Sequence, residues 1–137
     1  MTQQAIRQWM TSAPFTARPD LPVEVARRFM AERRIRHLPV VQDRLVLGII
    51  SDQDVERAPK TDKLLAVSAV MRPPETVDAS TPVSEVAREM ARRKTENAVI
   101  VVERGRVVGI FTTVDALLLL ARVMEGAAPS RVAATGT

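Results

Sequence analysis

The chain has 137 residues, of which 46% are hydrophobic and 26% charged, and its formal net charge is +4. These values are typical of a compact globular domain and exclude a disordered or collagen-like chain. Cysteine is absent, which excludes disulfides and thiolate catalysis, and no apolar run approaches the roughly 18 residues of a membrane span, so a cytoplasmic location is expected.

The first half of the chain predicts a short helix, an extended segment, a helix, a hairpin and a second helix. Apolar residues at helical spacing predict the short helix, and Pro22 stands where the first turn of the next helix tolerates proline. Two β-branched runs around the two-residue turn Asp43–Arg44 predict the hairpin, and Pro59 ends the last helix. The elements occupy Gln3–Met10, Thr11–Arg18, Val23–Arg34, Leu38–Ile50 and the segment that begins at Ser51.

The second half repeats this order of elements, which makes the chain a tandem of two units. The pattern Gly-Ile-x-[Ser/Thr]-x-x-Asp occurs at Gly48–Asp54 and again, 61 positions later, at Gly109–Asp115. A gapless alignment that sets Glu24 on Glu85 extends the match back through the preceding helix. The repeated elements occupy Leu64–Met71, Arg72–Ala79, Val83–Lys94, Val99–Phe111 and a helix that runs from Thr112 to Gly126.

Each unit is small for an independent domain. About sixty residues bury a marginal core alone, so the two units should pack face to face and form a cleft between them. The predicted boundaries are residues 1–60 for the first unit with its N-terminal helix, 61–125 for the second unit, and 126–137 for a disordered tail.

The last helix is unusually apolar. Between Val114 and Met124 only Asp115 and Arg122 are charged, so the apolar stripe is wider than burial against one small sheet requires. The pattern favours a homodimer seam or a partner surface along Val114–Met124. A terminal helix that is apolar without a partner stays open as the alternative.

Two stretches carry a family resemblance. Ile35–Asp54 and Glu96–Asp115, together with Met10-Thr11 and the helix openings at Pro22 and Pro82, resemble a tandem pair of CBS domains, the cystathionine β-synthase type of regulatory repeat. The resemblance covers roughly residues 6–124 and is to the stand-alone kind of Bateman module. It implies an α/β (α+β) fold of two β-α-β-β-α repeats packed as a pseudo-two-fold symmetric pair.

The resemblance also implies a ligand, an adenosine-containing nucleotide (AMP, ADP, ATP or a related adenosyl compound) in the clefts where the repeats meet. In family members that bind, the motif Asp holds ribose hydroxyls, which implies Asp54 and Asp115 here. The motif Ser or Thr contacts phosphate, which implies Ser51 and Thr112. The base is expected near Thr16, Ala17, Leu38 and Pro39 in one site, and near Thr76, Val77, Val99 and Ile100 in the other.

The same motif has a structural interpretation. Helix starts favour phosphate through unpaired N–H groups and the helix dipole. Ser51-x-x-Asp54 and Thr112-x-x-Asp115 nevertheless also resemble capping boxes, which would use the same lone pairs to begin a helix. The glycine of each motif allows either a ligand or a neighbouring strand to approach the backbone. Both interpretations stay open.

The two sites should differ in strength. Arg34, Arg36 and His37 precede the first hairpin, at positions where the resemblance implies phosphate-binding residues, although His37 is equally well interpreted as a partly exposed residue at the hairpin edge. The second unit has Thr95–Ala98 there, and Glu96 would repel phosphate. Gln53 stands where many relatives have arginine, which disfavours a highly charged ligand. We expect one good site and one weak or empty site.

No catalytic site is predicted. The chain has no Cys, no Tyr and a single His, which leaves no nucleophile and base pair, no metal site and no catalytic cofactor to expect. The favoured function is a sensor in which an adenine nucleotide rearranges the repeats or a homodimer and so signals to a protein partner. The alternative is a ligand-free oligomerisation scaffold. Nucleic-acid binding is disfavoured because the basic helices lack interleaved aromatic residues.

Overall fold

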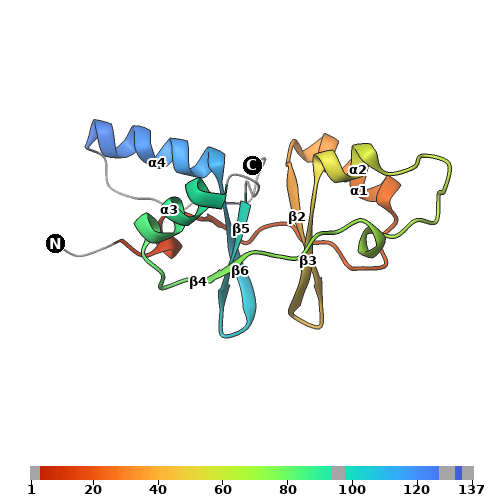
Figure 1. Ribbon diagram of the computed structural model, residues 1–137, viewed down its shortest axis with the longest axis horizontal. Helices are drawn as coiled ribbons and strands as arrows, with labels where there is room; N and C mark the ends of the chain where they lie inside the picture. Colours follow the sequence, from red (N-terminus) through yellow and green to blue (C-terminus); the bar gives the residue numbers. More distant parts are fainter. Residues whose placement is uncertain (1–3, 94–97, 127–131, 134–137) are drawn as a thin grey trace. The chain divides into compact units, whose positions relative to one another are not determined.

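The computed structural model describes residues 4–93, 98–126 and 132–133 and has a mixed α/β fold. The chain divides into two compact units (Figure 1). The first unit is Phe15–Pro74, and the second unit combines Met1–Pro14 with Glu75–Ala134. This division differs from the predicted boundaries, because the N-terminal segment lies with the second repeat and the residues up to Pro74 lie with the first.

The first unit is built on one antiparallel hairpin, with α1 and α2 on one face of it (Figure 1). Ala17 forms a parallel bridge with Val40 on one side of the hairpin, and Arg72 forms an antiparallel bridge with Ile49 on the other. The elements are α1 (Val23–Arg33), β2 (His37–Gln42), β3 (Leu45–Ser51), α2 (Asp52–Arg57) and the 3-10 turn η2 (Val67–Ala69).

The second unit repeats this arrangement with a longer sheet of strand order β4-β5-β6-β1-β7. The β4–β5 and β1–β7 pairs are parallel, and the β5–β6 and β1–β6 pairs are antiparallel. The elements are η1 (Ile6–Gln8), β1 (Thr11–Ser12), β4 (Thr76–Asp78), α3 (Val83–Arg93), β5 (Ala98–Glu103), β6 (Arg106–Thr112), α4 (Thr113–Glu125) and β7 (Val132–Ala133). Strand β7 lies in the segment predicted as a tail, of which 127–131 and 134–137 are outside the described residues.

Both predicted hairpins are confirmed, with the predicted two-residue turns. Asp43 and Arg44 have φ of 51° and 70°, and Arg104 and Gly105 have φ of 53° and 79°. Two consecutive residues with positive φ make the turn whose twist matches that of the flanking strands. A register shift follows Val40 in one hairpin and Val101 in the other, so the irregularity is also repeated.

The predicted helices Gln3–Met10 and Leu64–Met71 are only single 3-10 turns. Their N–H groups bond outside the turn: Ile6 donates to Thr81 O at 2.7 Å, and Val67 donates to Leu21 O at 2.8 Å. These bonds attach the first residue of each turn to another segment, and the backbone leaves helical geometry at Trp9 and Val70, where φ is −122°. Each turn buries one aliphatic side chain, Ile6 in the core of the second unit and Val67 in the core of the first.

Helices α1 and α3 correspond with an offset of 60 residues, not the 61 of the hairpins. Pro22 O accepts from the N–H of Ala26, and Pro82 O accepts from the N–H of Val86. Ala26 and Val86 are accordingly buried at corresponding positions of the two helices. The gapless alignment of Glu24 on Glu85 is therefore wrong by one residue within the helix, and the extra residue of the second repeat falls between α3 and β5.

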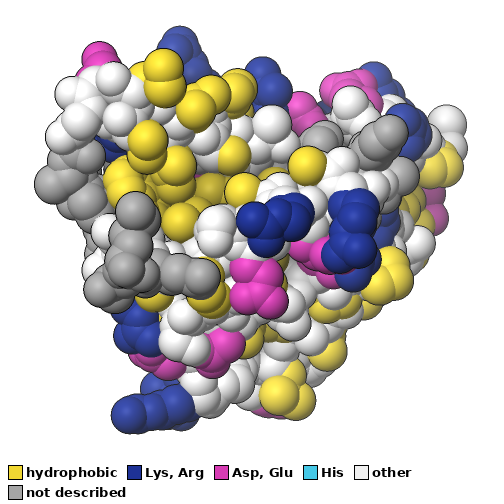
Figure 2. Space-filling model, turned by 60° about the vertical axis from the view of Figure 1, so that its left-hand side comes forward, with side chains coloured by type: hydrophobic (Ala, Val, Ile, Leu, Met, Phe, Trp, Pro, Cys, Tyr) yellow, Lys and Arg dark blue, Asp and Glu magenta, His cyan; other side chains and the backbone are white. Residues whose placement is uncertain are grey.

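Helix α4 packs through one side and exposes an apolar stripe on the other. Ala116 and Leu119 contact the core of the second unit. The exposed large residues are Val114, Leu117, Leu118, Leu120, Val123 and Met124. Figure 2 shows hydrophobic side chains gathered on this part of the surface. Within the described residues, no helix combines the length and apolar character needed to cross a bilayer.

Candidate functional site

Each hairpin ends in a capping box, as one of the two interpretations of the motif predicts. Ser51 Oγ accepts from the N–H of Asp54 at 3.1 Å, and Asp54 Oδ2 accepts from the N–H of Ser51 at 2.9 Å. The corresponding distances for Thr112 and Asp115 are 3.2 Å and 2.8 Å. Such a cap typically stabilises a helix by about 1 kcal/mol. The motif residues are therefore needed to begin α2 and α4.

The second oxygen of each carboxylate holds a segment that is distant in sequence. Asp54 Oδ1 accepts from Arg72 Nε at 2.9 Å, and Asp115 Oδ1 accepts from Thr11 Oγ1 at 3.0 Å. Thr11 and Arg72 are themselves 61 positions apart. Both aspartates are only 8% exposed. Asp54 thus links the start of α2 to the segment beside β3, and Asp115 links the start of α4 to the segment beside β6.

The two glycines allow those same segments to approach. A Cβ on Gly48 would lie 2.8 Å from Arg72 O and 2.7 Å from Met71 Sδ, and one on Gly109 would meet Met10 Sδ and lie 3.0 Å from Thr11 O. A real Cβ does not tolerate such distances. The close approach that requires glycine is therefore made by a neighbouring segment of the chain.

The electrostatic surroundings of the two helix starts differ. Burial raises the pKa of Asp115, against the effect of the hydrogen bonds from Thr112 and Thr11, which lower it. In the first unit, the positive charge of Arg72 lies directly on Asp54. His37 pairs with Ser51 across the hairpin, and burial lowers the pKa of this histidine while Asp52 opposes the shift. The first helix start therefore carries an ion pair and a histidine, whereas Ala98 occupies the position of His37 in the second.

The residues expected around the base are mostly part of the unit cores. The N–H of Ala17 donates to Pro39 O at 2.8 Å, so these two residues lie side by side. In the second unit, Thr76 pairs with Ile100 between β4 and β5. The side chains of Ala17, Leu38, Pro39, Val99 and Ile100 are buried, Val77 and His37 are half-buried, and Thr16, Thr76 and Arg36 are exposed. Thr95, Glu96 and Asn97 lie outside the described residues.

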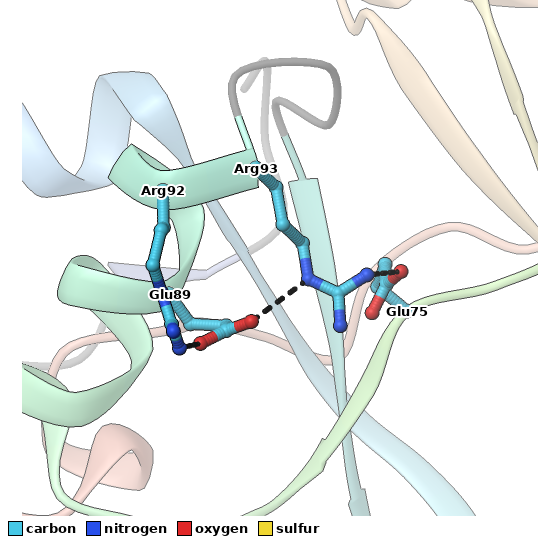
Figure 3. A network of polar contacts seen from close by, with 4 residues as sticks. All are labelled: Glu75, Glu89, Arg92 and Arg93. Carbon is cyan, nitrogen blue, oxygen red and sulfur yellow. Dashed lines mark hydrogen bonds and ion pairs between the residues drawn. The ribbon is translucent and has the colours of Figure 1, made fainter.

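The last residues of α1 and α3, Arg33 and Arg93, are a further pair of corresponding positions that the sequence analysis did not identify. Arg33, the last residue of α1, lies over the rings of Phe15 and Phe29, at 5.2 and 5.3 Å from their centroids. At the same position of α3, Arg93 bonds to Glu75 at 2.5 Å and to Glu89 at 3.1 Å (Figure 3). An alignment with an offset of 60 would have revealed these pairs.

A small cavity of about 40 Å³ lies beside the Arg93 network in the second unit. Its apolar lining comes from Val77, Val86, Met90 and Val99. In the first unit, the rings of Phe15 and Phe29 instead pack against the core.

Known proteins similar to this chain share the tandem arrangement. A model of the CBS domain matches residues 6–60 and again residues 67–122. The chain is 34% identical over 103 residues to inosine-5'-monophosphate dehydrogenase of Thermoplasma acidophilum, covering 74% of this chain but 20% of that enzyme. It therefore spans about a fifth of the length of that relative. It is 30% identical over 139 residues to a CBS domain-containing protein of Dictyostelium discoideum, covering 90% of this chain and 96% of that protein.

Solved structures agree with this assignment. The CBS domain pair of protein MJ0100, in complex with 5'-methylthioadenosine and S-adenosyl-L-methionine, has a TM-score of 0.77 and 26% identity and covers 88% of this chain and 98% of that chain. The acetoin utilization protein AcuB from Vibrio cholerae shares the fold, with a TM-score of 0.81 at 24% identity, over 90% of this chain and 95% of that one. Two copies of the domain, matched over most of the residues, place the chain in the CBS domain family.

Proposed function

We propose that the chain is a regulatory, non-catalytic module that binds an adenosine-containing small molecule at the helix start of its first CBS domain. The observation that carries the proposal is the cluster of His37, Ser51, Asp54 and Arg72, which combines both signs of charge with hydroxyl and imidazole groups. The MJ0100 domain pair, which holds two adenosyl compounds, supports this ligand class. Binding would signal by favouring one of two conformations or association states.

The acceptor capacity of the aspartates favours the first domain. An ionised carboxylate offers about four lone-pair positions. Two bonds occupy Asp54, from Ser51 N–H and Arg72, whereas three occupy Asp115, from Thr112 N–H, Thr112 Oγ1 and Thr11. A ribose hydroxyl can therefore be added at Asp54 more readily than at Asp115. The remaining residues of the proposal are Thr16, Ala17, Arg36, Leu38 and Pro39, with Thr76, Val77, Val99, Ile100 and Thr112 for a weaker second site.

Calorimetric titration of the full chain with S-adenosylmethionine, 5'-methylthioadenosine, AMP and ATP tests this proposal. We expect saturable binding of at least one of them. Arg36→Ala should weaken the binding of a phosphorylated ligand, because an exposed arginine before the hairpin would be lost. The matched control is Arg57→Ala, an exposed arginine in the last turn of α2. Flat titrations with all four compounds would contradict the proposal.

The exposed stripe of α4 supports a second proposal, that two copies of the chain associate through this helix. Val114, Leu117, Leu118 and Met124 follow one another at spacings of three, one and six residues and lie on the side away from the core. Leu118 is 55% exposed and Met124 79%. Burying apolar surface yields roughly 25 cal/mol per Å², so a second copy on this stripe would be stabilised by the hydrophobic effect.

Sedimentation equilibrium tests the dimer. The unmodified chain should have the mass of a dimer, and Leu118→Glu should be monomeric because the seam would bury an unpaired carboxylate. Leu45→Glu, which changes a leucine of similar exposure on β3, should remain dimeric. A monomeric unmodified chain, or a dimer that survives Leu118→Glu, would contradict the seam.

A further inference from the structure

The first unit has an open groove of about 660 Å³ that is distinct from the helix-start cluster. It lies between the beginning of α1 and the segment 59–63 that follows α2. This segment returns to α1, because Leu65 O accepts from the N–H of Val23 at 2.8 Å and Pro22 bridges to Ala66. Residues 59–64 between these points are exposed. In the second unit, α4 instead continues as a helix to Glu125.

Positive charge predominates in this groove. Arg27 and Arg28 come from the α1 wall, and Lys60 and Lys63 come from the opposite wall. Glu24 pairs with Arg27, and Lys60 pairs with Glu56 outside the groove. Asp62 keeps its charge, and its Oδ1 accepts from the N–H of Leu64 at 3.0 Å. Among the residues that the structure describes, Arg28 and Lys63 have no ion-pair partner.

The rest of the lining is aliphatic. Pro22, Val23, Val25 and Pro59 form the apolar part of the groove, and the neighbouring Leu64 is 88% exposed. Among the described residues that line the groove, none is an aromatic on which a nucleobase could stack. Unpaired cations on both walls with aliphatic surface between them suit an extended peptide that carries both carboxylates and aliphatic side chains.

We propose that this groove binds an acidic, leucine-bearing segment of a partner protein. The carboxylates of the segment would pair with Arg28 and Lys63, and its aliphatic side chains would cover Val25 and Leu64. This proposal does not depend on the adenosyl ligand, because the groove and the helix-start cluster share no residue.

Fluorescence anisotropy with an eight-residue peptide of alternating Glu and Leu tests the groove on the full chain. We expect saturable binding that weakens with added salt, because rim charge pairs are screened. The double variant Arg28→Glu with Lys63→Glu should weaken binding by about tenfold or more, and Leu64→Ser by about threefold, consistent with a few charge pairs and one apolar contact. A peptide of alternating Gln and Leu should show no saturation.

The matched control is Arg88→Glu, which changes the exposed arginine at the corresponding position of α3 and should leave the affinity within about twofold. Unchanged binding by the double variant would overturn the proposal, as would absence of saturable binding. Displacement by inorganic triphosphate as effectively as by unlabelled peptide would also overturn it, in favour of a small-anion site. S-adenosylmethionine should not displace the peptide, and displacement would refute the independence of the two sites.

Discussion

The start of α2 and the start of α4 have the same backbone arrangement but different partners for the capping carboxylate. Asp54 is neutralised by Arg72, whereas Asp115 is held by the hydroxyl of Thr11 in buried surroundings. A second difference lies at the last residue of α1 and α3, where Arg33 stacks on phenylalanines and Arg93 pairs with glutamates. The duplicated backbone therefore depends on the cap and the glycine, while the charges around them are free to differ.

Alanine at the motif glycine should have the largest effect on stability. Gly48→Ala places a Cβ 2.8 Å from Arg72 O, which cannot move freely because it accepts from the N–H of Ile49 at 3.0 Å. Overpacking of this kind costs about 1–3 kcal/mol. Urea denaturation should show a loss near the upper end of that range for Gly48→Ala.

Gly105→Ala is the control for that prediction. Gly105 has φ of 79°, but a Cβ added there would have no other atom within 4 Å, and the corresponding Arg44 already adopts φ of 70°. The loss should be about 1 kcal/mol, the cost of a left-handed conformation. Gly48 does not have a positive φ, so an equal loss at Gly48 and Gly105 would contradict the close approach as the reason for the motif glycine.

Asparagine at the two aspartates should separate the two helix starts. In Asp54→Asn, an NH2 group replaces one carboxylate oxygen and faces either the Nε donor of Arg72 or the N–H of Ser51. One donor therefore loses its acceptor, and the free energy of unfolding should fall by about 2 kcal/mol. In Asp115→Asn, the hydroxyl of Thr11 can rotate to accept from the amide, so the loss should stay below about 1 kcal/mol. Equal losses in urea denaturation at pH 7 would contradict the difference in partners.

The pH dependence of stability gives an independent check on Asp115. Its pKa is raised in the folded state by burial, so folding is favoured most below the ordinary value of 3.8. That contribution is lost as the pH rises through the folded pKa. Asp115→Asn should remove this component from the pH profile of the unfolding free energy. An unchanged profile would show that Asp115 does not titrate differently in the folded chain.

The ends of α1 and α3 should differ in their response to salt. Arg93→Ala removes two partly exposed ion pairs, which are worth less than about 1 kcal/mol each and are weakened in 1 M NaCl. Arg33→Ala removes contacts with two rings, which are worth about 0.5–1 kcal/mol each at exposed sites. The cost of Arg93→Ala should therefore shrink in salt more than that of Arg33→Ala. Equal salt dependence would contradict this assignment.

Local patterns in the sequence were sufficient for the hairpin turns and the capping boxes, because their partners are within a few residues. Long-range contacts were not visible. The bond from Thr11 to Asp115 spans 104 positions, and the one from Ile6 to Thr81 attaches the N-terminal segment to the second unit. The offset of 60 between the helices was obscured because the sequence Glu-Val-Ala-Arg recurs at an offset of 61. The buried residues of α1 and α3 correspond at 60.

Part of the helix-start cluster was also visible in the sequence. The motif residues Ser51 and Asp54 do lie together, since a helix start requires it. The partner Arg72 was not foreseen, because nothing local to Asp54 indicates it. Leu38 and Pro39 are buried in β2, and their contact with a base stays a prediction.

The smallest effect is expected from His37, which the second domain replaces with Ala98. Burial lowers the pKa of His37 from 6.5, so the neutral form is favoured in the folded chain. Its contribution to stability is present above pH 6.5 and is lost as the pH falls through the lower folded value. His37→Ala should therefore flatten the decline in the free energy of unfolding between pH 7.5 and about pH 5. An identical decline in the variant would show that Asp52 offsets the effect of burial on the pKa of His37.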